Sequence, residues 1–421
     1  MNLRGPGESV PVNESGVAEL QGLYGPFSFP EKLLQKIWLR GEYARQGCRT
    51  VDGRDLEVIY PGKWNLLGGP DFKQARLRLG GIELTGDVEL HLHARDWAAH
   101  GHAADPAYDR VVLHVVLFPP GAGQLTSGAN GTIIPELVLL PLLHHDLEEY
   151  AADEAVERFA NRPMTQALQE LGALEPSALR ALMDRFAIRR WQMKVHFARL
   201  RLQRLGWEEA CHQTALEILG YRFNRAAMVR VATRFPLPEW REGRVGAESA
   251  FAEEKERWSL HGVRPTNHPR VRLRQYERWV CARPDWPERL VRAAQTVPVN
   301  GSVTESTAEF RRMHGFPAWR AELSDNLCDT HVSGPRFDTL WCDGFLPLLA
   351  ARFHQAVEAI WFHWFPGNLP PDVLRTLRLL EVIGRRSQPA SHGAGQGLLG
   401  WLIEKENRAA APGGAGVGRG A

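Results

Sequence analysis

Four ionisable side chains occupy every second position of one short stretch of the sequence: Asp87, Glu89, His91 and His93. The residues between them are apolar. Because the side chains of a β-strand alternate between its two faces, this pattern predicts a strand that carries all four groups on one face. Carboxylates and imidazoles grouped in this way are costly to bury unless a cation or a proton network holds them together. The stretch is therefore the candidate chemical centre of the chain.

Two interpretations of this face remain open at the level of sequence. In the first, the face binds a metal ion. In the second, it is an ordinary solvated strand face whose acids pair with Arg76 and Arg78 of the preceding strand. Motif matches of this kind are hypotheses, and the elements around them decide between the two interpretations.

A β-hairpin is predicted to bring a fifth ionisable group, Asp71, toward this face. The segments Phe72–Leu79 and Ile82–His93 flank Gly80-Gly81, and two glycines between alternating segments are a strong signal for a tight hairpin turn. With this turn, position 79 pairs with position 82, so position 71 faces position 90 and Asp71 points away from Glu89. A shared site therefore needs an irregularity in the pairing.

Two irregularities would satisfy that need. A bulge at Gly86 would shift the pairing by one residue and bring position 71 beside position 91, and glycine inside a strand often marks a bulge. Alternatively, Asp71 lies in the loop directly after Pro70, outside the pleat of the strand.

Pro70-Asp71, with Glu89-x-His91 eighteen residues further on, resembles the Pro-Asp…(Asp/Glu)-x-Lys signature of the restriction-endonuclease-like nuclease superfamily. The resemblance implies that Asp71 and Glu89 hold Mg²⁺ or Mn²⁺, which polarises the scissile phosphate and lowers the pKa of the attacking water. His91 stands where the superfamily has its lysine. A neutral imidazole can act as a base there, but the substitution removes a permanent positive charge.

The candidate catalytic residues are therefore Asp71, Glu89 and His91, and the first two are the candidate metal ligands. A second ligand set is also open. Asp87, His93, His100 and His102 are additional candidates, and the histidines among them could form a Zn²⁺ or Mn²⁺ site together with His91.

The elements that must position these residues form one α/β region, residues 27–150. A helix is predicted to begin at Pro30 and to run through Trp38, because apolar residues there recur at helical spacing. Strands are predicted at Leu56–Tyr60, in the two arms of the hairpin, and at Val111–Phe118. The predicted order is helix, three strands, connecting segment, strand, which is also the order of the restriction-endonuclease-like core.

The rest of the chain is predicted to be an all-α domain, residues 151–407, so the fold class is α+β. Clear helices are expected at Pro176–Leu205 and Glu208–Leu219. Residues 1–26 and 408–421 are rich in Gly, Pro and Ala and are predicted to be disordered tails.

A row of basic residues on one of these helices is a candidate nucleic-acid contact: Arg190, Lys194, Arg201 and Arg204. They lie within one arc of the helix, and such a row can follow a phosphate backbone. The alternative is a solvated helix face.

Composition narrows the class of protein. The formal net charge of +2 over 421 residues neither requires nor excludes a nucleic-acid partner. No apolar run approaches the ~20 residues that span a bilayer, so no membrane partner is expected. The N-terminus lacks the apolar segment of a signal peptide, and the five scattered cysteines are typical of reduced thiols, so a cytoplasmic location is predicted. The sequence lacks a phosphate-binding loop, a dinucleotide fingerprint and a nucleophile elbow.

Motifs along most of the chain, roughly residues 28–407, resemble a bacterial family known as Domain of Unknown Function 2851. The residues that carry this resemblance lie around the hairpin and in the helical region: Gly69-Pro70-Asp71-Phe72, Gly86, Val88-Glu89-Leu90-His91, Asp96-Trp97, His100, His102, Asp105, Tyr108, Leu113-His114-Val115-Val116, Arg264-Pro265, Asn267, Pro269 and Gln396-Gly397-Leu398-Leu399. The family implies no activity.

The leading interpretation of the function is therefore a metal-dependent phosphodiesterase or nuclease that acts on nucleic acid. Two alternatives come from other classes. One is a non-catalytic module that binds nucleic acid or protein, and the other is a structural domain stabilised by Zn²⁺. Metal content distinguishes the three, and the sequence carries no information on the oligomeric state.

Overall fold

The computed structural model describes residues 12–13, 17–22, 25–121, 125–159, 164–221, 224–255, 257–260, 263–297 and 301–410. The chain divides into two compact units. The first comprises the residues up to Glu154 together with those from Asn407 onward, and the second runs from Ala155 to Glu406. Both sheets lie in the first unit, and the second is helical, so the α+β class is confirmed. Each unit is described below by itself.

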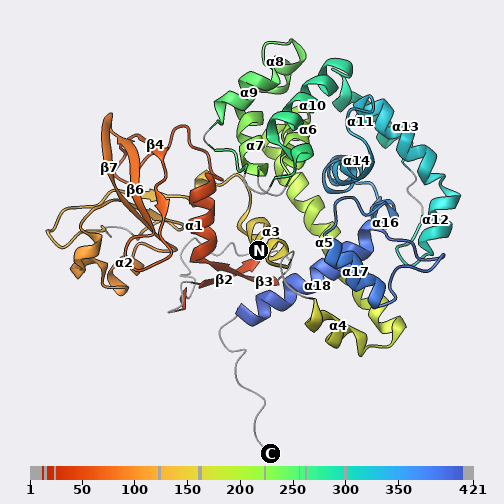
Figure 1. Ribbon diagram of the computed structural model, residues 1–421, viewed down its shortest axis with the longest axis horizontal. Coiled ribbons are helices and arrows are strands. Elements are labelled where there is room, and N and C mark those ends of the chain that lie inside the picture. Colours follow the sequence, from red (N-terminus) through yellow and green to blue (C-terminus); the bar gives the residue numbers. More distant parts are fainter. Residues whose placement is uncertain are drawn as a thin grey trace, which may run out of the picture. The chain divides into compact units, whose positions relative to one another are not determined.

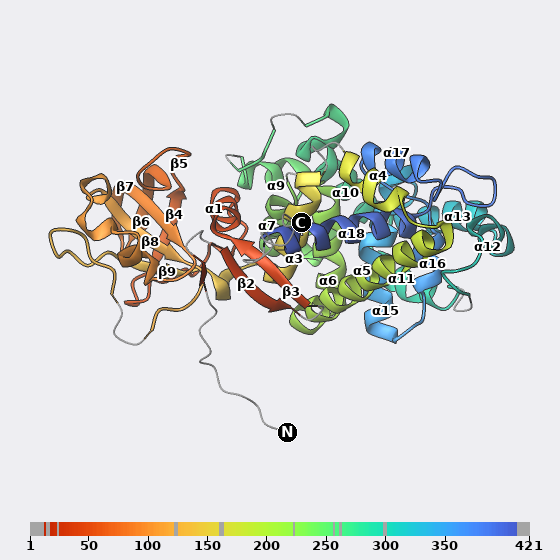
Figure 2. The ribbon, with the colours of Figure 1, turned by 90° about the horizontal axis from the view of Figure 1, so that it is seen from below.

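A mixed sheet of six strands forms the centre of the first unit (Figure 2). Its strands are β4 (Leu56–Tyr60), β5 (Lys63–Trp64), β6 (Phe72–Leu79), β7 (Ile82–His91), β8 (Val111–Val116) and β9 (Glu136–Val138). The order across the sheet is β4-β6-β7-β8-β9, and β5 pairs with β6. The pairs among β4, β6 and β7 are antiparallel, whereas β7–β8 and β8–β9 are parallel. The three strands, the connecting segment and the further strand predicted from the sequence are all present, and β5 and β9 are additional.

The connecting segment between β7 and β8 is made of three short helical turns, α2 (Asp96–Ala99), η1 (His102–Ala104) and η2 (Pro106–Tyr108). A further turn, η3 (Leu140–Leu142), follows β9.

Helix α1 (Glu31–Arg40) lies beside the sheet and packs against β7 (Figure 1). Leu34, Ile37 and Trp38 recur at helical spacing and are fully buried. Burying each large apolar side chain stabilises the fold by about 1.5–3 kcal/mol, so this face fixes the helix on the sheet. Glu31 and Gln35, four residues apart, therefore occupy fixed positions along one side of the helix.

Part of the predicted N-terminal tail is instead folded. Strands β1 (Val12–Asn13), β2 (Val17–Gly22) and β3 (Gly25–Pro30) form a small antiparallel sheet. The prediction of disorder over residues 1–26 is wrong for these strands, because Ala18 and Leu20 alternate with other residues and are buried. Residues 1–11 and 411–421 lie outside the described residues, so most of the two predicted tails is not addressed.

The second unit is built from helices packed around a core rich in tryptophan. Helix α3 (Leu147–Phe159) spans the boundary between the units, and the others follow: α4 (Thr165–Gly172), α5 (Pro176–Leu205), α6 (Trp207–Leu219), α7 (Arg225–Arg234), α8 (Leu237–Arg241), α9 (Ala247–Glu253), η4 (Pro265–Asn267), α10 (Pro269–Ala282), α11 (Trp286–Ala294), α12 (Thr307–Met313), α13 (Phe316–Cys328), α14 (Gly334–Thr339), η5 (Leu340–Phe345), α15 (Leu346–Phe353), α16 (Glu358–His363), α17 (Pro371–Leu379) and α18 (His392–Ala410). Within the described ranges, no helix has the length and apolar character needed to cross a membrane.

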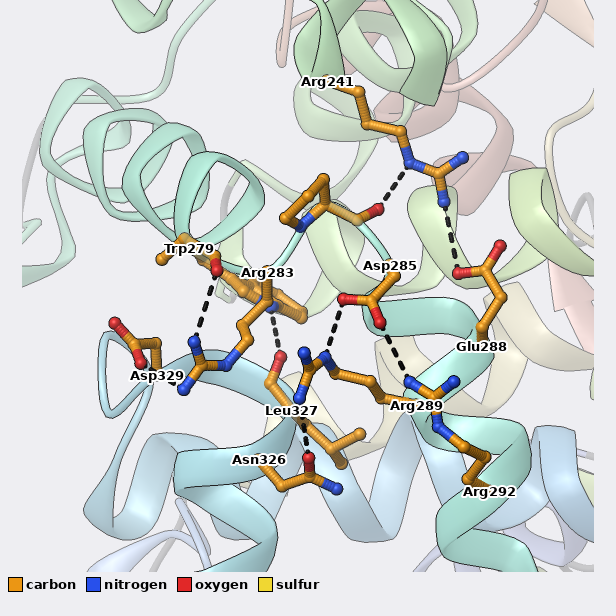
Figure 3. Close-up of polar contacts among 12 residues, drawn as sticks. Arg241, Trp279, Arg283, Asp285, Glu288, Arg289, Arg292, Asn326, Leu327 and Asp329 are labelled. Carbon is orange, nitrogen blue, oxygen red and sulfur yellow. Dashed lines mark hydrogen bonds and ion pairs between the residues drawn. The ribbon is translucent and has the colours of Figure 1, made fainter.

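Arginines of this unit form ion pairs within it, as the region around α11 illustrates (Figure 3). The Asp285 carboxylate accepts one hydrogen bond from Arg289, at 2.7 Å, and one from Arg292, at 2.9 Å. Arg289 also donates to the side-chain oxygen of Asn326, at 3.0 Å. Arg289 therefore connects α11 to α13.

Candidate metal centre

A bulge in β6 brings Asp71 beside Glu89. The hairpin turn pairs Leu79 with Ile82, as predicted, but the register shifts by one residue between the pairs Ala75–Gly86 and Phe72–Val88. The extra residue lies in β6, where Gln74 has a φ of 59°. Continued by one step, the shifted register places position 71 opposite position 89. The two carboxylates, which the unshifted register would separate, are therefore brought together.

The expected bulge at Gly86 is therefore wrong in its position. Gly86 is instead required by close packing. A Cβ at this residue would lie 2.7 Å from the carbonyl oxygen of Arg110 and 2.4 Å from Cγ1 of Val112. The glycine lets the start of β8 approach β7 closely. The parallel pairing is itself irregular there, between Asp87 and Val88.

Hydrogen bonds tie the two carboxylates to each other's backbone. The Asp71 N–H donates to Oε2 of Glu89, at 2.9 Å, and the Leu90 N–H donates to Oδ2 of Asp71, at 3.1 Å. Nε2 of Gln35, from α1, donates to Oδ1 of Asp71, at 2.7 Å, and Nε1 of Trp64 donates to the Gln35 side-chain oxygen, at 3.2 Å. The position of the Asp71 side chain is therefore fixed from the helix and from the sheet.

Three carboxyl groups meet in this cluster, because Glu31 of α1 joins Asp71 and Glu89. Burial, together with the charges of Asp71, Glu89 and Asp96, raises the pKa of Glu31 to about 9. Burial likewise raises the pKa of Asp71, with a contribution from the charge of Glu89, and burial raises the pKa of Glu89. Three acids that disfavour each other's ionised form are typical of a site that takes up protons or a cation.

The cluster opens to the surface through a pocket. Its polar lining comes from Glu31, Lys32, Gln35, Asn65 and Asp71. Glu89 lies behind this lining and is only 5% exposed. A ligand in the pocket therefore meets the carboxyl groups of Glu31 and Asp71 from the solvent side.

Glu31, Lys32 and Gln35 were not predicted as site residues. A signal for them exists in the sequence, since Glu31 and Gln35 stand four residues apart at the start of an amphipathic helix. That spacing predicts that they share a face but does not indicate which strand the face approaches.

Histidines from β7 and the connecting segment form a second cluster on the other side of Glu89. One ring nitrogen from each of His91, His100 and His102 lies within 4.8 Å of the other two. Nε2 of His91 lies 3.1 Å from Nδ1 of His100. Oε1 of Glu89 lies 3.3 Å from Nε2 of His102 and 3.6 Å from Nε2 of His91. Glu89 thus stands between the carboxyl cluster and the histidine cluster.

A buried hydrogen-bonded chain continues from His91 toward β9. Nδ1 of His91 lies 2.9 Å from Nε2 of His114, and Nδ1 of His114 lies 2.8 Å from the Thr126 hydroxyl. That hydroxyl donates to Oε1 of Glu136. Burial lowers the pKa of His91 and the pKa of His114, so both rings are neutral near pH 7. His114 is therefore the link between His91 and Glu136.

Two of the predicted additional ligands do not join either cluster. Oδ1 of Asp87 accepts a hydrogen bond from the Gln74 N–H, at 3.0 Å, and so stabilises the bulge in β6. The His93 ring stacks on Phe118, with 4.9 Å between ring centroids. The predicted four-histidine zinc set is therefore reduced to three by the loss of His93.

The interpretation of this strand face as solvated is wrong. Asp87, Glu89 and His91 are 6%, 5% and 1% exposed. Arg78, which was expected to pair with these acids, pairs instead with Glu57 and Glu83. The ionisable groups Asp87, Glu89 and His91 of β7 are therefore buried and are not paired with Arg78.

The predicted row of nucleic-acid contacts on α5 is largely engaged within the second unit. Lys194 pairs with Asp343, at 2.7 Å. Arg201 pairs with Glu217, at 2.7 Å, and Arg190 donates to the Gln396 side-chain oxygen, at 2.6 Å. Arg204 is exposed. The nucleic-acid contact stays a prediction. The partners of these residues lie far away in the sequence, and a helix pattern cannot indicate them.

The comparisons with known proteins place this chain in a family without assigning it a chemistry. A family model described as "Protein of unknown function (DUF2851)" matches residues 31–252, which is more than half of the chain and includes both clusters. No curated protein and no solved structure matches it. The chemistry therefore has to be argued from the residues of the site.

Proposed function

Because the chain belongs to the DUF2851 family, whose description names no activity, we propose a function from the site itself: metal-dependent hydrolysis of phosphodiesters in nucleic acid. The observation that carries this proposal is the cluster of Glu31, Asp71 and Glu89 beside a pocket, with raised pKa values. The order of α1, the antiparallel strands, the connecting segment and parallel β8 supports it, because this is the order of the restriction-endonuclease-like core.

The donor set of the cluster fits a hard divalent cation. Asp71 and Glu89 would hold Mg²⁺ or Mn²⁺, since both ions favour carboxylate oxygens, and Glu31 adds a third carboxylate at the pocket. Burial raises the three pKa values, and charge repulsion adds to it for Glu31 and Asp71; a bound cation would offset both effects. When bound, such an ion polarises a phosphoryl oxygen and makes water a better nucleophile.

Residues of the chain supply the remaining functions. Gln35 and the backbone N–H groups of Asp71 and Leu90 hold the carboxylates in place before a substrate arrives, which limits the cost of ordering them. Lys32 lines the pocket and offers the positive charge that the motif position at His91 lacks.

In this proposal the general base is Glu31 instead of His91. In the hydrolysis the water oxygen bonds to phosphorus, the ester P–O bond breaks, and the departing oxygen takes up a proton. Glu31 lines the pocket. Once a bound cation displaces the proton of Glu31, its carboxylate would be placed to accept a proton from the water and to pass it to the departing oxygen. His91 is 1% exposed and belongs to the histidine cluster, so the role of base predicted for it is not retained.

Asp71→Asn in the full chain tests this proposal. The substitution keeps the side-chain shape and removes one negative charge from the cluster. We expect the wild type to cleave single- or double-stranded DNA or RNA with Mg²⁺ or Mn²⁺ and to stop on chelation, and the variant to lose about 10³-fold, because several kcal/mol of transition-state stabilisation depend on the bound cation.

Glu83→Gln is the matched control, since Glu83 lies on β7, the strand of Glu89, and its side chain is 66% exposed. It should cleave like the wild type. Cleavage by Asp71→Asn at the wild-type rate would contradict the proposal. So would a wild type that cleaves none of these substrates with either ion.

A further inference from the structure

We propose that His91, His100 and His102, together with Glu89, bind a second metal ion, a transition metal of the Zn²⁺ class. Imidazole nitrogen suits Zn²⁺, whereas Mg²⁺ prefers oxygen, so the two clusters differ in the metal that they favour. The His91, His100, His102 and Glu89 set is called the histidine site below. Its binding of metal stands on geometry alone. Its role beside the carboxyl cluster rests on the proposed function.

Three separations between donor atoms of the histidine site are close to those of a tetrahedron around such an ion. With Zn–N distances of about 2.0–2.1 Å, tetrahedral ligand atoms lie about 3.3–3.4 Å apart. The observed separations are 3.1 Å between His91 and His100, 3.3 Å between His102 and Glu89, and 3.6 Å between His91 and Glu89. All three are within about 0.3 Å of the tetrahedral value. The remaining histidine separations are within 4.8 Å, so side-chain rotation would bring the donors together around an ion.

One ring nitrogen of His102, Nε2, is buried and has no hydrogen-bond partner within the described part of the chain, although Glu89 lies near it. The ring is held in place by stacking on Tyr108, with 3.8 Å between centroids, and by an edge contact with Trp97. A buried nitrogen without a partner costs stability, and a metal ion would satisfy it.

The chain between the two neighbouring histidines turns both rings toward His91. His100 ends α2 and His102 begins η1, and Gly101 between them has a φ of 74°, which glycine adopts without strain. His100 is exposed to solvent, whereas His91 is buried. An ion can therefore reach the site past His100.

The chain of hydrogen bonds behind His91 selects the tautomer that can bind metal. Ionised Glu136 only accepts, so the Thr126 hydroxyl donates to it and must accept from Nδ1–H of His114. Neutral His114 then accepts at Nε2 from Nδ1–H of His91. This leaves the lone pair of His91 on Nε2, the atom that faces His100. Such support behind a ligand histidine is common in zinc sites.

Glu89 connects the histidine site to the carboxyl cluster. Its Oε2 accepts from the Asp71 N–H, and its Oε1 faces His91 and His102. If both clusters bind metal, Glu89 is a bridging ligand and the centre is binuclear. In that arrangement the second ion adds positive charge near the one held by Asp71, which stabilises charge on a transferring phosphoryl group.

Titration of the full chain with Co²⁺ tests the histidine site without relying on activity. Co²⁺ in a tetrahedral nitrogen and oxygen site gives visible absorption bands, and Zn²⁺ should displace it. We expect one equivalent of Co²⁺ to give these bands. His100→Gln and His102→Gln should weaken binding by more than 10-fold. His93→Gln is the matched control and should bind like the wild type, because its ring lies outside the cluster.

A second pair of variants tests the hydrogen-bonded chain. Thr126→Val removes the hydroxyl between His114 and Glu136 and should weaken Co²⁺ binding by about 10–100-fold, whereas Thr126→Ser should restore it. Asp71→Asn should keep the Co²⁺ bands even where hydrolysis is lost, so failure of the two proposals can be distinguished. Absence of tetrahedral bands in the wild type would overturn the histidine site. So would wild-type binding by the exposed-site variant His100→Gln, which is the variant least affected by any folding defect.

Discussion

Glu89→Gln is expected to abolish phosphodiester hydrolysis and to weaken Co²⁺ binding at the histidine site in the same protein. The reason is its place between the two clusters, with one oxygen on the Asp71 N–H and the other facing His91 and His102. An amide keeps the shape but binds cations more weakly than a carboxylate. Loss of several kcal/mol of transition-state stabilisation corresponds to about 10³-fold or more in rate. Cleavage assays and Co²⁺ titration on one preparation measure both effects.

Glu89→Gln should nevertheless fold, because removing one of three repelling acids offsets the loss of an ionised acceptor. We therefore expect a melting temperature in the absence of metal that is no lower than that of the wild type. Two results would contradict this account: cleavage within a few-fold of the wild type, or loss of cleavage with a collapsed melting temperature, which indicates a structural role for Glu89.

The stability of the metal-free protein is expected to depend strongly on pH. Glu31, Asp71 and Glu89 have folded-state pKa values above those of the unfolded chain, so the folded protein holds protons that the unfolded chain has released. The stability that such groups contribute is present at low pH, and it is lost as the pH rises toward their pKa in the folded state. The free energy of unfolding should therefore fall between pH 6.5 and 8, by about 1.4 kcal/mol per pH unit for each such proton.

The pH window is set by the histidines. Burial lowers the pKa of His91 and the pKa of His114, so these rings oppose folding only below about pH 6.5, where the unfolded chain binds the extra protons. Above that value these two rings no longer contribute, and the acids of the cluster lower the stability as the pH rises. Thermal unfolding of the metal-free full chain across this window measures the slope, and Mg²⁺ or Mn²⁺ should restore the stability lost at pH 8.

Glu31→Gln should reduce the slope, because it removes one of the three acids and leaves the other two with one charge fewer nearby. Glu57→Gln, an exposed acid whose side chain is 60% exposed, should leave it unchanged. Stability that stays constant or rises from pH 6.5 to 8 would show that these carboxyl groups do not hold protons in the folded state.

The sequence was sufficient to predict the local elements of the site. Gly80-Gly81 predicted the turn that pairs Leu79 with Ile82, and alternation predicted that Glu89 and His91 share a strand. Both signals are local, since a two-residue turn and a period of two residues depend only on neighbours in the chain. The order of one helix, three strands, a connecting segment and a strand followed from them.

The parts that could not be predicted depend on contacts distant in the sequence. Nothing in the residues around Gln74 signals the bulge, which Asp87 stabilises from the next strand. Gln35 reaches Asp71 across 36 positions. The same reason explains why the ion pair of Lys194 was not predicted, since its partner Asp343 belongs to a later helical turn. Pattern periodicity indicates which face a residue occupies but does not indicate what covers that face.

The central claim is that Asp71 and Glu89 hold a divalent cation. A crystal of the full chain grown with Mn²⁺, with data collected to locate manganese by its anomalous scattering, tests it most directly. We predict a manganese peak in contact with a carboxylate oxygen of Asp71 and one of Glu89, next to the pocket lined by Glu31. Manganese bound elsewhere on the chain, with no peak between these two carboxylates, would contradict the account.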